Sequence, residues 1–152
     1  MKTLGNPADK QVLIERLQKV RSDSSGAWGK MSAPQMICHL NDSFRLVQGE
    51  KQVAPKDNLF TRTVMKWVAL SLPIPWPHGL QGPPEIDQQI GGTPPAEFEA
   101  DKLDLVSLTE RFAGKPECLA STRHPFFGKL TIEEWMRWAY LHMDHHLRQF
   151  NC

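Results

Sequence analysis

The spacing of apolar residues along the chain indicates helices over most of its length. Leu13, Leu17 and Val20 recur at intervals of three or four residues, which is the period of one helix face. Asn6 is a favourable N-cap residue, and Pro7 suits the first helical position. We therefore expect a first helix that begins after Asn6 and fades over residues 22–26.

Two capping boxes mark the starts of two further helices. In each, a Ser or Thr is followed three residues later by a Gln or Glu whose side chain can return to the cap. Ser32 and Gln35 begin a helix that Gly49 ends, and Thr131 and Glu134 begin the last helix. Helical periodicity in both segments supports these assignments.

The middle of the chain is less regular. Residues 59–72 are apolar on most sides and predict a third helix, and Thr93-Pro94 is expected to begin a fourth that ends at Gly114. Between Pro73 and Pro95 lie seven of the twelve prolines and four of the ten glycines, which excludes regular helix and central strand. Residues 115–129 predict a loop, and no β-type alternation is present.

These elements predict an all-α protein, most economically a four-helix bundle with one extra short helix and a long Pro/Gly-rich connection. The length of 152 residues is that of one domain, 1–152. Connections as long as 73–95 tend to be functional or mobile, so this one is expected either to form a pocket wall or to pack outside the bundle.

Charge and composition exclude some function classes. The net charge of +1 and the scattered basic residues provide no field for nucleic acid or an anionic membrane. The most apolar stretch, 64–76, is interrupted by Lys66 and two prolines and is too short to span a bilayer. The first residues carry no signal-peptide pattern, and three unpaired-looking cysteines (Cys38, Cys118 and Cys152) favour a reduced, cytoplasmic location.

The last helix carries the strongest chemical signal. His142 and His146 lie four residues apart, so their imidazoles project from the same face about 6 Å apart along the axis. That spacing allows two nitrogens to bind one metal ion, and His39 on the second helix can supply a third. His145 is rotated by about 100° from His146 and is expected not to be a ligand.

Two interpretations of these histidines remain open. A buried imidazole needs partners for both nitrogens, and a divalent cation bound by Nε2 meets that need while leaving a position for an activated water. Alternatively, the histidines are polar core groups hydrogen-bonded to Asp42, Ser43 or Asp144.

Further candidates surround this set. Asp42, three residues after His39, can orient an imidazole or act as a base, or it can be a surface charge. His124, Trp135 and His145 are candidate pocket residues. Their plainer interpretations are a loop histidine bonded to backbone, a packing anchor and a solvent-facing residue. His78 is expected to be exposed.

Three segments resemble the DinB/YfiT-like superfamily, over about residues 13–150, and the loop and the last-helix segment are similar to an uncharacterised branch of it. They are Trp28–Asp42 (WGKMSAPQMICHLND), the loop His124–Thr131 (HPFFGKLT) and Tyr140–Phe150 (YLHMDHHLRQF). The resemblance implies a four-helix bundle, often dimeric, in which His39, His142 and His146 hold a divalent metal. It also implies that some relatives are thiol-dependent transferases or isomerases that act with low-molecular-weight thiols.

The expected protein is thus a cytoplasmic, homodimeric, metal-binding bundle holding Zn²⁺, Ni²⁺ or Fe²⁺, to all of which imidazole is suited. Its expected activity is metal-dependent hydrolysis or thiol-dependent transfer on a small molecule. The alternative is a non-catalytic binding or structural protein whose histidines are core or metal-storing groups.

Overall fold

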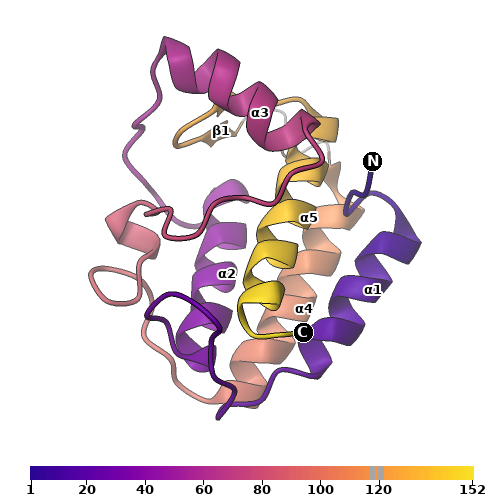
Figure 1. The fold of residues 1–152 in the computed structure, drawn as a ribbon, viewed down its shortest axis with the longest axis vertical. Coiled ribbons are helices and arrows are strands. Elements are labelled where there is room, and N and C mark those ends of the chain that lie inside the picture. Colours follow the sequence, from indigo (N-terminus) through magenta and orange to yellow (C-terminus); the bar gives the residue numbers. More distant parts are fainter. Residues whose placement is uncertain (117–118, 120–121) are drawn as a thin grey trace.

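The computed structural model describes residues 1–116, 119 and 122–152, and this part of the chain is mostly helical. Four longer helices lie side by side: α1 (Pro7–Gln18), α2 (Ala33–Val47), α4 (Phe98–Gly114) and α5 (Ile132–Gln149) (Figure 1). A short π-helix, η1 (Thr61–Met65), continues into α3 (Lys66–Ser71) across one end of them. The mostly helical fold predicted from the sequence is confirmed.

The starts of three helices follow the predicted capping signals. The Asn6 side chain accepts hydrogen bonds from the backbone N–H groups of Ala8 and Asp9 at the start of α1. Both capping boxes form, with Ser32 and Thr131 as the caps of α2 and α5. Each cap satisfies N–H groups that have no partner inside the helix, which stabilises the helix by about 1 kcal/mol.

A single apolar core joins these helices. Helix α2 packs against α4, and α5 packs against α1 and α3. The core includes Leu13, Leu17, Met36, Leu40, Phe44, Leu105, Phe112, Trp135, Met143 and Leu147. Burial of each such side chain contributes roughly 1.5–3 kcal/mol. Because α5 is buried along most of its length, its histidines are carried into the interior.

Helix α4 begins later than predicted. Its first residue is Phe98, and the Glu97 carboxylate caps it by accepting from the N–H groups of Glu99 and Ala100. Thr93 lies outside the helix because its N–H and hydroxyl both donate to Asp42. The contact with Asp42 therefore overrides the helix-start signal of Thr93-Pro94.

The predicted loop 115–129 contains a small hairpin, so the protein is not purely α-helical. Strands β1 (Arg123–His124) and β2 (Gly128–Lys129) pair antiparallel. Gly128 adopts a left-handed φ of 68°, which a side chain would make unfavourable. Two-residue strands are too short to show alternation, which explains why the sequence pattern did not reveal them. Cys118 lies outside the described residues.

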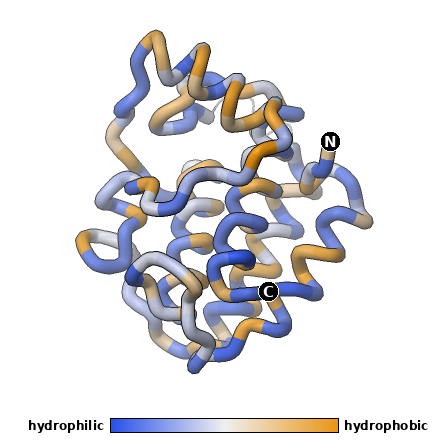
Figure 2. Tube along the Cα trace, in the orientation of Figure 1, coloured by the Kyte–Doolittle hydropathy of each residue, from blue (hydrophilic) through white to orange (hydrophobic). Residues whose placement is uncertain are grey.

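The predicted third helix, 59–72, corresponds to η1 and α3, and several of its apolar residues face outward. Phe60 is 58% exposed and Trp67 is 59% exposed, and Figure 2 shows the hydrophobic stretches along this part of the tube. The following segment, 73–95, holds only the short 3-10 helix η2 (Pro84–Ile86), in agreement with its prolines and glycines. No helix in the described residues is long and apolar enough to cross a membrane.

Candidate metal centre

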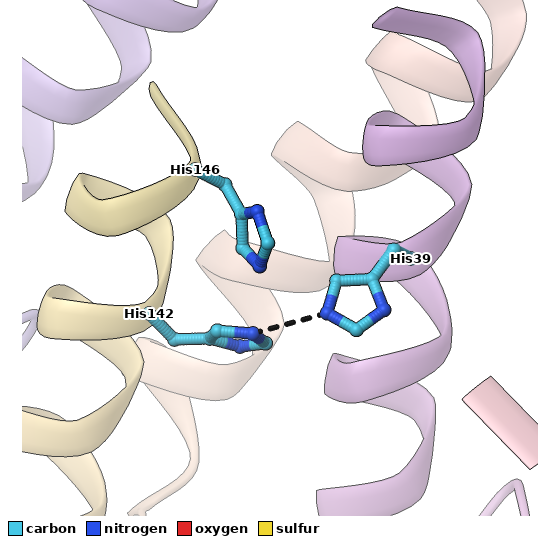
Figure 3. Close-up of side chains that lie close together, drawn as sticks. All are labelled: His39, His142 and His146. Carbon is cyan, nitrogen blue, oxygen red and sulfur yellow. Dashed lines mark hydrogen bonds between the residues drawn. The ribbon is translucent and has the colours of Figure 1, made fainter. Parts of the chain in front are cut away.

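Helices α2 and α5 bring His39, His142 and His146 together (Figure 3). The Nε2 atoms of His39 and His142 are 3.2 Å apart, and one nitrogen from each of the three rings lies within 4.8 Å of the others. Two ligands on a tetrahedral zinc, with bonds of 2.0–2.1 Å, place their nitrogens roughly 3.3 Å apart. The three rings are therefore spaced for one ion, as the sequence pattern predicted.

The outer nitrogen of His39 is held by backbone. Its Nδ1 lies 2.7 Å from the carbonyl oxygen of Ile86, in η2. A carbonyl only accepts hydrogen bonds, so Nδ1 carries the proton and Nε2 presents its lone pair to the centre. The Pro/Gly-rich segment thus sets the tautomer of one candidate ligand.

A side-chain amide performs the same task for His146. Gln149 Nε2 donates to the carbonyl oxygen of Trp28 at 2.8 Å, which leaves Gln149 Oε1 facing His146 Nδ1 at 2.9 Å. Nδ1 must therefore donate, and the lone pair of His146 is on Nε2. Gly29 allows this approach: its φ is +80°, and a Cβ there would lie 2.6 Å from Gln149 Nε2.

Burial keeps all three imidazoles uncharged. Loss of hydration lowers the pKa values of His39, His142 and His146, and the neighbouring imidazoles lower that of His142 further. The neutral imidazole is the form that ligates a metal ion. Burial therefore favours the neutral, ligating form of the three imidazoles.

A cavity of about 780 Å³ lies against the three histidines. Its walls come from η1 and α3, from the segment 74–89, and from the hairpin loop 124–127. This volume is in the range of sites that bind drug-sized molecules. Three protein ligands on a tetrahedral ion leave one open position, and here the three rings border the cavity.

Two further histidines also line this cavity. His145, a candidate pocket residue whose plainer interpretation is a solvent-facing one, is only 8% exposed. The ring centroid of Trp28 lies 5.9 Å from that of His145 in an edge-on contact, and the ring centroid of Trp76 lies 6.2 Å away. His124 Nδ1 accepts from the N–H groups of Phe126 and Phe127, as a loop histidine bonded to backbone would. Burial lowers the pKa of His124 to about 3 and that of His145 to about 4.

Three other predicted residues lie elsewhere. Trp135 is fully buried in the core, and the cavity-lining residues of the described chain include Trp138 but not Trp135. Asp42 is also fully buried, where its carboxylate accepts from Lys51, Gln88 and Thr93. These contacts anchor the segment 88–93 and do not reach the three rings. His78 is exposed, as expected, and stacks on Trp28 with ring centroids 4.0 Å apart.

Gln149 and the Ile86 carbonyl were missed by sequence reasoning. Gln149 lies three residues after His146 on the same helix face, so the spacing could have revealed it. A backbone carbonyl such as that of Ile86 leaves no trace in residue identity, and only the fold reveals it.

A family model described as "Protein of unknown function (DUF1569)" matches residues 6–152. The chain belongs to this family. The match covers both helices of the three-histidine site in this DUF1569 protein, and it does not itself connect the family to the DinB/YfiT-like superfamily. No curated protein and no solved structure gives a significant match.

Proposed function

We propose that His39, His142 and His146 bind one divalent metal ion, with Zn²⁺, Ni²⁺ and Fe²⁺ as candidates. The observation that carries this proposal is the paired orientation of two rings. The Nδ1 groups of His39 and His146 donate outward to Ile86 and Gln149, which leaves both Nε2 lone pairs directed at the centre. This arrangement is the usual support for histidine ligands in metal sites.

The proposed activity is hydrolysis or thiol-dependent transfer on a small molecule in the adjoining cavity. A divalent ion held by three neutral ligands keeps its full charge and lowers the pKa of a bound water or thiol. The protein would exclude bulk water through its apolar walls and position the substrate beside His142. We propose the same four-helix-bundle architecture as in DinB/YfiT-like proteins, since α1, α2, α4 and α5 lie side by side.

Elemental analysis of protein purified without added metal tests the site. We expect about one ion per chain in the wild type and none in His142→Ala. The control variant His78→Ala, which removes an exposed histidine outside the three proposed ligands, should retain the ion. A chelator should lower the melting temperature of the wild type because the ion binds only the folded state. Stoichiometric metal in His142→Ala would refute the proposal.

One observation favours a second, non-catalytic function. His39 Nε2 and His142 Nε2 are close enough to hydrogen-bond to each other, so the cluster can satisfy most of its ring nitrogens without an ion. In that case the histidines are polar core groups that join α2 to α5. A metal-free preparation whose melting temperature is unchanged by zinc or by chelator would establish this alternative.

A further inference from the structure

The cavity beside the three histidines is apolar almost throughout. Apart from histidines, the only charged side chains that line it in the described chain are Lys30 and Asp87. Lys30 is exposed, and the Asp87 carboxylate accepts from the N–H of Gln89. Most of the other lining side chains are apolar, among them Phe60, Val64, Met65, Trp76, Leu80 and Trp138. Four are polar but uncharged: Ser43, Gln81, Gln89 and Gln149.

Apart from Lys30, Asp87 and the histidines, no side chain that lines the cavity in the described residues carries a formal charge. A charged ligand would therefore lose its hydration over mostly apolar walls, with only the exposed Lys30 or the half-buried Asp87 as an ionic partner, which is unfavourable. An apolar ligand would instead remove apolar surface of both partners from water.

Aromatic rings line the part of the cavity next to His39, His142 and His146. The ring centroids of Trp138 and Trp76 lie 5.0 Å and 6.1 Å from the ring centroid of His142. At the other side, Phe60 and Val64 line the cavity although they are 58% and 50% exposed, so apolar wall continues out to solvent. Apolar surface therefore extends from solvent to the three rings.

We propose that this cavity binds an uncharged, mainly apolar small molecule, with one end next to His142. Its volume of about 780 Å³ suits a drug-sized ligand rather than a macromolecule. The assignment of this molecule as a substrate rests on the proposed metal-dependent function. Its binding does not, because the walls are present without an ion.

Two dyes with the same ring skeleton test the proposal in chelator-treated protein. N-phenyl-1-naphthylamine is neutral, whereas 8-anilinonaphthalene-1-sulfonate carries a sulfonate, and both fluoresce in apolar surroundings. We expect the neutral dye to bind at least about tenfold more tightly, because the sulfonate would lose its hydration against mostly apolar walls. Equal or tighter binding of the sulfonated dye would overturn the proposal.

A matched pair of variants locates the bound dye. Val64→Asp places a charge at the cavity, and Val12→Asp places one on α1 at a valine of similar exposure, 44%, that does not line the cavity. We expect Val64→Asp to weaken the neutral dye by at least about tenfold and Val12→Asp to change it less than about twofold. Phe60→Ser provides a second, uncharged test if Val64→Asp fails to fold.

Unchanged dye affinity in both Val64→Asp and Phe60→Ser would refute the proposal. It would also be refuted if sedimentation showed that Val64→Asp weakens dye binding only because a dimer dissociates. The two proposals fail separately. Neutral-dye binding in a protein that never binds metal leaves the cavity assignment intact. Metal binding without dye binding leaves only the metal site.

Discussion

Replacement of His124 by Asn should remove a specific part of the acid sensitivity of the fold. His124 is 6% exposed, and its Nδ1 accepts from the N–H groups two and three residues later, those of Phe126 and Phe127. An Asn side-chain oxygen accepts hydrogen bonds in the same local pattern. His124→Asn therefore keeps the turn but removes the titrating group.

The magnitude follows from the two pKa values. Burial lowers the pKa of His124 from 6.5 to about 3, so between these values the unfolded chain binds more protons than the folded one. The contribution of neutral His124 to the free energy of unfolding is therefore fully present above pH 6.5 and is lost as the pH falls toward 3. Between pH 7.5 and 4.5 the loss attributable to His124 is about 2.6 kcal/mol, at a slope near 1.4 kcal/mol per pH unit.

Urea unfolding of wild type and variant at pH 7.5, 6.0, 5.0 and 4.5, with chelator present, measures this difference. The smaller Asn leaves a packing defect that lowers stability at every pH, so the two curves are offset at pH 7.5. The variant should then lose about 2.6 kcal/mol less than the wild type by pH 4.5. Parallel curves, offset by the same amount at all four pH values, would show that folding does not lower the pKa of His124 and would refute the reasoning.

Three other substitutions, one of them with a matched control, test residues around the site. Gln149→Leu should weaken metal binding by about 10–100-fold, because His146 loses the acceptor that fixes its tautomer. Competition with a chromophoric chelator measures this, and an unchanged affinity would contradict it. Gly29→Ala should lower the free energy of unfolding by about 2–3 kcal/mol, since it adds a clash with Gln149 to backbone strain. Gly49→Ala, with a similar φ of +78° and no neighbour within 4 Å, should cost only about 1 kcal/mol. Asp42→Asn should destabilise by about 3 kcal/mol through loss of the buried pair with Lys51, while the metal content stays unchanged. Loss of metal from a folded Asp42→Asn protein would restore a direct role for this carboxylate.

Local rules were sufficient for part of the candidate site. The i,i+4 spacing of His142 and His146 places them on one face of any helix, and the capping boxes defined where α2 and α5 begin. His39 lies close to His142 and His146 because α2 and α5 each bury the face that carries these rings. Helical periodicity alone is enough to predict such a face.

Other features depend on contacts between distant segments, which periodicity does not encode. His145 lies on the flank of α5 that also carries Trp138 and Leu141, outside the stripe of His142 and His146, and Trp28 and Trp76 from two loops cover it. Asp42 is buried because Lys51 and Thr93 reach it from the segments that follow α2 and precede α4. Burial of these two side chains is a property of loop paths, and a single sequence shows no pattern for those paths.

The separation of the three histidines along the chain has a consequence for biosynthesis. His39 precedes His142 by 103 residues, and the groups that orient the rings come from loops before α2 and before α4 as well as from α5. A nascent chain that stops short of α5 therefore presents only His39 of the three proposed ligands, which is too few to form the site. Assembly of the three-histidine site must wait until α5 has been translated and has docked, so any metal loading follows folding of the chain rather than guiding its early steps.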